Sequence, residues 1–106
     1  MKKYHNVTVD VLGEKWKIKR LAGLVSQGIM GKCVFAEKTI YIDASLSGYQ
    51  LEHTFLHELG HALIYRSSIY QSLPHEIEEI LVDIFGTFLL DNFSLKRLSK
   101  NKSRSN

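Results

Sequence analysis

The sequence predicts an α+β fold, in which a small antiparallel β-sheet is followed by two helices. Two observations lead to this prediction. Apolar and polar residues alternate, as in half-buried strands, as far as Asp43. Beyond Leu51 the apolar residues instead recur at the three-to-four-residue spacing of helices. A chain of 106 residues is long enough for one small domain with a single core.

The first predicted strands form a β-hairpin. Residues 7–11 (VTVDV) and 15–19 (KWKIK) each alternate apolar with polar side chains, and Gly13-Glu14 between them supplies a turn. A loop follows around residues 26–31. A second pair of strands is then predicted at residues 32–35 (KCVF) and 38–43 (KTIYID), with a turn at Ala36-Glu37. Together these strands make the predicted antiparallel sheet.

Two helices are predicted after the strands. The first covers residues 51–65, and residues 67–74 interrupt its pattern. The second begins near Pro74, a favourable first-turn residue, and ends near residues 91–92. Acidic residues in its first turn suit the positive end of the helix dipole. Its apolar side is expected to consist of Ile77, Ile80, Leu81, Ile84, Phe85 and Phe88.

Composition divides the chain into a domain at residues 1–93 and a basic tail at residues 94–106. The tail, SLKRLSKNKSRSN, contains five basic residues and no acidic one, so it accounts for the positive sign of the chain's net charge of +3. The rest of the chain is mildly acidic. We expect a disordered, solvated tail, and a weak, salt-sensitive contact with nucleic acid or an acidic partner surface is the alternative.

Signals for membrane insertion or export are absent from the sequence as given. No stretch approaches the roughly 20 apolar residues needed to span a bilayer, and the first residues lack the apolar core of a signal peptide. We therefore expect a cytoplasmic protein with no membrane partner. Cys33 is the only cysteine, which excludes an internal disulfide. We expect it to be a half-buried strand residue, with a redox or metal-ligand role as the alternative.

Residues 57–61 read HELGH, which matches the HExxH pattern. His57 and His61 lie one helical turn apart on the same face, so both imidazoles can bind one Zn²⁺. Glu58 is rotated by about 100° from His57. At that position it can serve as the general base toward a metal-activated water instead of binding the metal. The sequence therefore predicts a zinc site, and the alternative is a helix whose histidines bind no metal.

A catalytic zinc site needs a third protein ligand besides the two histidines. The second predicted helix offers Glu76, Glu78, Glu79 and Asp83. On a helical wheel Glu79 and Asp83 share a face away from the apolar side, whereas Glu78 falls nearer to it. Glu79 is the predicted ligand, and Asp83 is expected to accept the other N–H of a ligand histidine. Glu78 and Asp83 are the alternative ligands.

HELGH at residues 57–61, followed by EILVD at residues 79–83, resembles the HExxH…ExxxD arrangement of the gluzincin metallopeptidases. The short chain, the strand ahead of the motif helix and the run DIFGTFLL at residues 83–90 resemble more closely the ImmA/IrrE-type peptidases. Small HExxH proteins of bacteriophages and prophages are similar too. The resemblance implies a zincin-like domain at residues 1–93 and cleavage of a cytoplasmic regulator or repressor.

The predicted function is that of a zinc-dependent endopeptidase with a protein or peptide substrate. Tyr65 and His75 are candidate donors to the transition state, as are Tyr49 and Tyr70, and spacing distinguishes none of them. His53, one turn before His57, is expected to be a surface residue, with a role at the metal as the alternative.

An extended substrate is expected to add to the strand at residues 38–43 as a further strand. Two other functions compete with the enzyme: a metal-stabilised binding or inhibitory module, and a nucleic-acid-associated protein that uses the basic tail. Glu58 favours the enzyme, because a pure binding module has no use for a base there.

Overall fold

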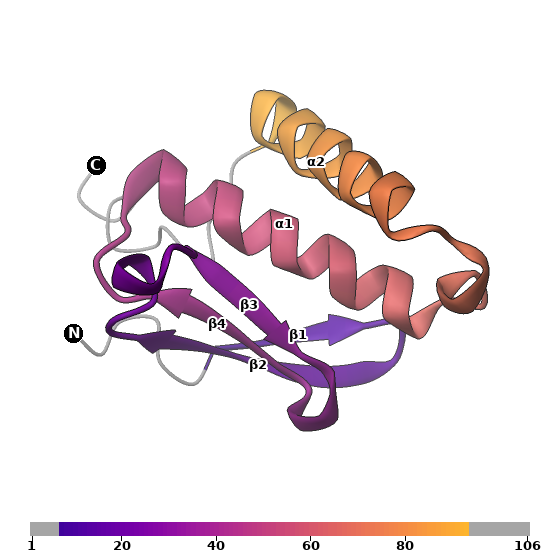
Figure 1. The fold of residues 1–106 in the computed structure, drawn as a ribbon, viewed down its shortest axis with the longest axis horizontal. Helices are drawn as coiled ribbons and strands as arrows, with labels where there is room; N and C mark the ends of the chain where they lie inside the picture. The colour runs from indigo at the N-terminus through magenta and orange to yellow at the C-terminus, as the bar shows by residue number, and fades with distance from the viewer. Residues whose placement is uncertain (1–6, 94–106) are drawn as a thin grey trace.

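The computed structural model describes residues 7–93 and is α+β, with one four-stranded sheet and two helices. The elements are β1 (Val7–Val11), β2 (Glu14–Leu21), β3 (Gly31–Val34), β4 (Thr39–Asp43), α1 (Gly48–Arg66) and α2 (His75–Asn92). Figure 1 shows α1 along one face of the sheet and α2 on the far side of α1. The predicted coarse fold class is therefore confirmed. The predicted tail at residues 94–106 lies outside the described residues.

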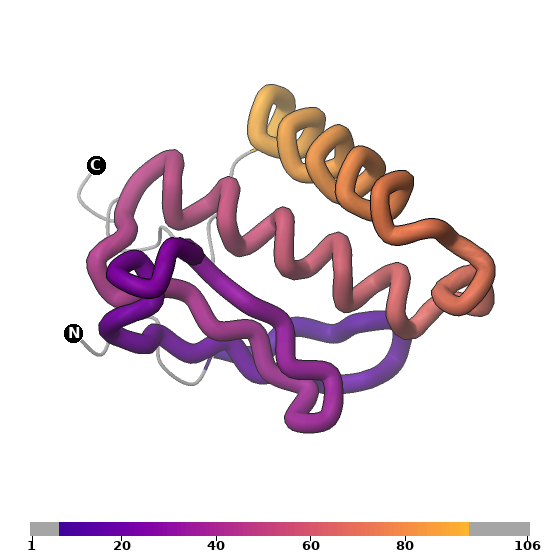
Figure 2. Tube along the Cα trace, viewed as in Figure 1, coloured from indigo at the N-terminus to yellow at the C-terminus, as the bar shows by residue number. Residues whose placement is uncertain are grey.

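The sheet is mixed, so the prediction of an antiparallel sheet is wrong. Both predicted hairpins are present, since β1 pairs with β2 and β3 pairs with β4 in antiparallel fashion. The two hairpins, however, are joined by parallel pairing of β2 with β4, in the order β1-β2-β4-β3. After β2 the chain passes to the outer strand β3 and returns along β4, as the trace in Figure 2 shows. β4 is thus an interior strand and β3 an edge strand.

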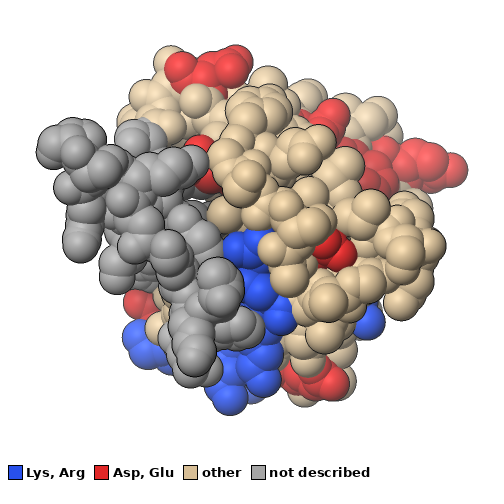
Figure 3. Space-filling view, turned by 90° about the vertical axis from the view of Figure 1, so that its left-hand side faces the viewer, with Lys and Arg blue, Asp and Glu red and all other residues tan. Residues whose placement is uncertain are grey.

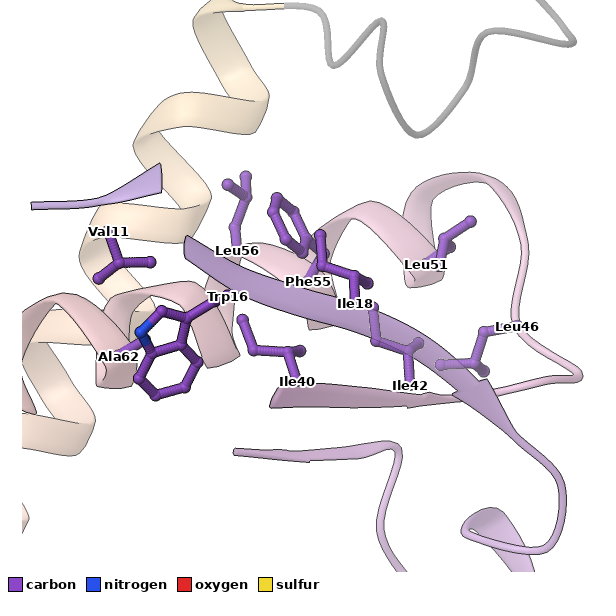
Figure 4. Close-up of a cluster of buried hydrophobic side chains, with 10 residues drawn as sticks. All are labelled: Val11, Trp16, Ile18, Ile40, Ile42, Leu46, Leu51, Phe55, Leu56 and Ala62. Carbon is purple, nitrogen blue, oxygen red and sulfur yellow. The ribbon is translucent and has the colours of Figure 1, made fainter. Parts of the chain in front are cut away.

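The core lies between the sheet and α1 (Figure 4). Alternation along β2 turns Trp16 and Ile18 inward and leaves Lys15 and Lys17 exposed. Burying such apolar surface stabilises the fold by roughly 25 cal/mol per Å². The buried hydrophobic cluster consists of Val11, Trp16, Ile18, Ile40, Ile42, Leu46, Leu51, Phe55, Leu56 and Ala62.

α2 packs against α1 through a face that differs from its predicted apolar side. Its buried residues are Glu78, Val82 and Gly86. Ile80 and Ile84, two residues of the predicted apolar side, are exposed instead. The helix rests on the part of α1 that carries histidines and a glycine, so a polar and small-residue face fits there. Within residues 7–93, neither helix combines the length and apolarity needed to cross a membrane.

Candidate metal centre

The histidines of HELGH lie in the middle of α1 and project from the same face. The ring centroids of His57 and His61 are 5.0 Å apart, with the ring planes at 73° to each other. Both side chains are largely buried, with 28% of His57 and 13% of His61 exposed. Two imidazoles so placed are separated by one helical turn and can face a common point.

Glu79 of α2 brings a carboxylate to both histidines. Its Oε1 lies 3.3 Å from Nε2 of His57, and its Oε2 lies 3.2 Å from Nε2 of His61. One ligand atom from each of the three residues falls within 4.8 Å of the others. Ligands bound at about 2.0–2.1 Å to a tetrahedral ion lie about 3.3–3.4 Å from each other. The three side chains therefore stand at the spacing of neighbouring ligands around one small cation.

A close crossing of the two helices makes this approach possible. A Cβ at Gly60 would lie 2.8 Å from Cγ1 of Val82, well inside van der Waals contact. At Gly86 of α2, a Cβ would lie 3.4 Å from Cβ of Leu56. The two glycines let the backbones come together near the histidines. The sequence reasoning missed this role, although a glycine inside a helical pattern is the signal for a close packing contact.

Glu78, and not Asp83, meets the second nitrogen of a histidine of the centre. Nδ1 of His61 donates to Oε2 of Glu78 at 2.6 Å, and both side chains are nearly buried. Because a carboxylate only accepts, the proton sits on Nδ1, and Nε2 of His61 is left as the electron-pair donor toward Glu79. Asp83, predicted for this task, lies 3.8 Å from Nε2 of His53 instead. Glu78 shares the packed face of α2 with Val82 and Gly86, which differs from the predicted apolar side.

Glu58 is buried beside the two histidines. Burial of its carboxyl group raises its pKa to about 7, an effect that His61 opposes and the charge of Glu79 reinforces. The pKa of His57 is lowered, chiefly by burial and then by His61. A neutral imidazole is the form that binds metal, so the surroundings of His57 favour the state a ligand needs.

A cleft of about 320 Å³ opens beside His57 and Glu58. One wall is α1, with His53 and Thr54, and the other is the segment from Gly28 to Gly31. A Cβ at Gly31 would lie 2.7 Å from Cγ2 of Thr54, so the start of β3 rests directly on α1. The cleft therefore connects the buried carboxyl group of Glu58 to the edge of the sheet.

Asp43, at the end of β4, holds the segment that forms this wall. Its Oδ1 accepts the backbone N–H of Val25 at 3.0 Å, and its own N–H donates to the carbonyl oxygen of Met30 at 2.8 Å. Its Oδ2 accepts the backbone N–H of Ser45 at 2.8 Å. The hydroxyl of Ser45, which also donates to Oδ2, has the largest effect on the pKa of Asp43 and, with the backbone N–H groups of Val25 and Ser45, lowers it to about 2. The sequence reasoning gave no role to Asp43.

The candidate donors to the transition state fall at different places. His75 lies at the start of α2, with Nε2 3.6 Å from Oε2 of Glu79 and its side chain mostly exposed. Tyr65 instead stacks on Phe35 at a centroid distance of 4.2 Å. Tyr70 packs edge-on against Tyr65, and Tyr49 stacks on His53. His75 is thus the candidate that contacts the centre, and Tyr65 has aromatic neighbours.

Cys33 is half-buried on β3 and packs against the core, as predicted. Burial, followed by the charges of Glu58 and Glu78, raises the pKa of its thiol to about 12. The candidate metal-binding group among the described residues consists of His57, His61 and Glu79 and does not include Cys33.

Comparison of the chain with protein-family profiles, with curated proteins and with solved structures gives no match.

Proposed function

We propose that this chain is a zinc-dependent endopeptidase of the gluzincin, ImmA/IrrE-like type, which hydrolyses a peptide bond in a cytoplasmic protein. The observation that carries the proposal is the convergence of His57, His61 and Glu79 beside the buried carboxyl group of Glu58. A cytoplasmic regulator or repressor is the proposed class of substrate.

The donor set fits zinc. Two imidazoles and one carboxylate are a known ligand set of catalytic zinc, which leaves a fourth position open. The hydrogen bond from His61 to Glu78 supports this assignment, since ligand histidines usually donate their second N–H to a carboxylate or carbonyl oxygen. When bound, zinc supplies a Lewis acid that polarises a carbonyl group and lowers the pKa of water toward ~7.

Glu58 is the proposed general base. It follows His57 directly on α1 and lines the same cleft, so its carboxylate faces the space in which a scissile peptide would lie. From there it takes a proton from the attacking water and passes it to the leaving amine. His75, 3.6 Å from Glu79, is the proposed source of an additional hydrogen bond to the oxyanion.

The proposed substrate lies along β3. β4, the strand predicted from the sequence to receive the substrate, pairs with β2 on one side and with β3 on the other. It therefore has no free edge to which a peptide could add. β3 pairs with β4 alone among the described strands, and its first residue, Gly31, lines the cleft. An extended peptide added to this edge would run past Glu58.

Metal content and activity test the proposal separately. Elemental analysis should find near-stoichiometric zinc in the purified protein and strongly reduced zinc in the His57→Ala and Glu79→Ala variants. Glu58→Gln should keep the zinc and lower the cleavage of an unstructured peptide mixture, followed by mass spectrometry, by about 10²–10⁴-fold. Zinc without cleavage in the wild type would favour the metal-stabilised binding module. Full zinc content in the Glu79→Ala variant would remove Glu79 from the ligand set.

A further inference from the structure

α2 has a second face that is largely exposed, although the ring of Phe93 lies edge-on to Phe88 at a centroid distance of 6.4 Å. The helix forms the outermost layer of the molecule, on the side of α1 away from the sheet (Figure 1). Ile80, Ile84 and Phe88 along this face have 55%, 60% and 57% of their surface exposed. Together with neighbours that are more than 40% exposed, they form what we call the α2 stripe: Ile77, Ile80, Leu81, Ile84 and Phe88.

The α2 stripe has the pattern of a surface made for another helix. Its residues recur at the three-to-four-residue spacing that aligns side chains along one side of a helix. A stripe of such anchors is the pattern by which helices dock in grooves or on each other. The exposed side chains therefore indicate a binding surface.

An apolar hollow continues the α2 stripe toward α1. It has a volume of about 140 Å³ and opens between the two helices, with Leu81 belonging both to the hollow and to the stripe. Its lining is apolar apart from backbone, which suits an inserted aliphatic or aromatic side chain. The hollow is lined by Gly60, Leu63, Ile64, Leu81, Val82 and Phe85.

Charge indicates the chemistry of the partner. From Ser67 to Phe93 the sequence contains five acidic residues and neither lysine nor arginine. At about 100° per residue, Glu76 and Asp83 fall along the border of the stripe opposite the hollow, whereas Asp91 falls within the arc of the stripe, beyond Phe88. Figure 3 shows the blue lysine and arginine atoms mainly in the lower, sheet half of that view, whereas red atoms lie at its top and also among the blue ones below. A partner that meets this border needs positive charges there.

Other occupants fit less well. A second copy of α2 offers no basic side chain to the acidic border. An anionic membrane surface attracts amphipathic helices whose polar face is rich in lysine and arginine, which α2 lacks. The chain's own residues 94–106 are basic but contain only two large apolar residues, Leu95 and Leu98, against the five of the stripe.

We propose that the α2 stripe binds an amphipathic helix of another protein, whose apolar side packs on Ile80, Ile84 and Phe88 and whose lysine or arginine border faces Glu76 and Asp83. The docked helix would lie on the outside of the helix that carries Glu79. This surface is independent of the proposed peptidase activity, because none of the stripe residues belongs to the metal centre.

Two synthetic peptides of the length of α2, 18 residues, test the proposal with the full chain. Both carry leucines in a heptad pattern; one has a lysine border and the other a glutamate border. Fluorescence anisotropy should show one-to-one binding of the lysine peptide, at least about tenfold tighter than the glutamate peptide and tighter still at low salt. The Ile80→Gln/Ile84→Gln variant should lose about tenfold or more in affinity. Ile69→Gln, a change of an exposed isoleucine outside the stripe, should not.

Four results would overturn the proposal. If the lysine peptide does not bind, the proposed basic amphipathic partner is excluded. If the two peptides bind with equal affinity, the stripe is an unspecific apolar surface. A dimer in sedimentation equilibrium that dissociates in the Ile80→Gln/Ile84→Gln variant assigns the stripe to a second copy. Affinity for the lysine peptide that rises in a Lys96→Gln/Arg97→Gln/Lys100→Gln variant assigns it to the chain's own terminus.

Discussion

His61 donates from Nδ1 to the buried carboxylate of Glu78, at 2.6 Å, and thereby turns Nε2 toward Glu79. The bond fixes both the tautomer and the ring orientation of His61 without the help of a metal. Glu78 and Glu79, adjacent on α2, thus have different relations to the same ring. The carboxylate of Glu78 orients the imidazole through Nδ1, and the carboxylate of Glu79 lies beside Nε2 at the candidate metal position.

Glu78→Gln should weaken zinc binding by about 10–100-fold, because the neutral amide no longer makes the imidazole a better donor. Competition with a fluorescent zinc chelator measures the effect. Glu76→Gln removes the same charge from an exposed position in the same helical turn and serves as the control. Equal affinities of these two variants would show that only the net charge of α2 matters.

Gly60→Ala should destabilise the protein by about 1–3 kcal/mol, since the new methyl group overlaps Val82 in a packed contact. The helix propensity of alanine, worth about 1 kcal/mol, opposes this effect but does not remove the overlap. Urea unfolding measures the change in free energy. Combining the substitution with Val82→Ala should recover part of the loss, and strictly additive effects in this double-mutant cycle would contradict the proposed contact.

Zinc should raise the melting temperature of the wild-type chain. Free zinc at a hundred times the dissociation constant stabilises by about 2.7 kcal/mol when it binds the folded state alone. For a small domain this corresponds to a shift of about 10–20 °C, readable by circular dichroism before and after chelation. The His57→Ala variant should melt at the same temperature with and without zinc.

Asp43 should make stability depend on pH on the acidic side. Its pKa in the folded protein, about 2, is below the value of about 3.9 for an unfolded chain, so the ionised form is bound more favourably when folded. This stabilisation is complete above about pH 4 and disappears as the pH falls toward 2. Urea unfolding should therefore find Asp43→Asn less stable than wild type at pH 6, with the difference shrinking toward pH 2. A difference that is constant with pH would exclude the carboxylate as its cause.

The thiol of Cys33 should react slowly in the folded protein. A pKa of about 12 leaves very little thiolate at pH 8, and the thiolate is the reactive form. Iodoacetamide should alkylate native Cys33 at least about a hundredfold more slowly than the urea-unfolded chain, as followed by mass spectrometry. Similar rates in the two states would reopen a redox or ligand role for this cysteine.

Local patterns account for what could be predicted about the fold. Each hairpin depends on alternation and on a turn a few residues long, and α1 and α2 depend on apolar spacing within one segment. The mixed sheet could not be predicted in this way. Whether β2 neighbours β4 or β3 is decided by which strand can be buried on both sides, and that depends on residues far apart in the sequence.

The same distinction holds for the centre. The spacing of His57 and His61 places them together on any helix, which is why they could be named from the sequence. The wheel of α2 places Glu78 nearer to the apolar side than Glu79, but the structure packs the arc of Glu78, Val82 and Gly86 against α1. Gly60 determines that choice by allowing Val82 to approach. Pairs of residues such as Gly60 and Val82 determine how two helices pack. The sequence of one helix alone does not reveal which residues of the other helix it contacts.

The parallel pairing of Ile18 with Ile40 also bears on how quickly the chain reaches its native state. Each hairpin closes a short loop, whereas joining β2 to β4 closes the longer loop that contains β3. Non-local pairing of this kind slows folding relative to helices and hairpins. We therefore expect the two hairpins to form early and their union to limit the folding rate. On this route α1 can pack on the complete sheet, and α2 on α1, only after that slow step.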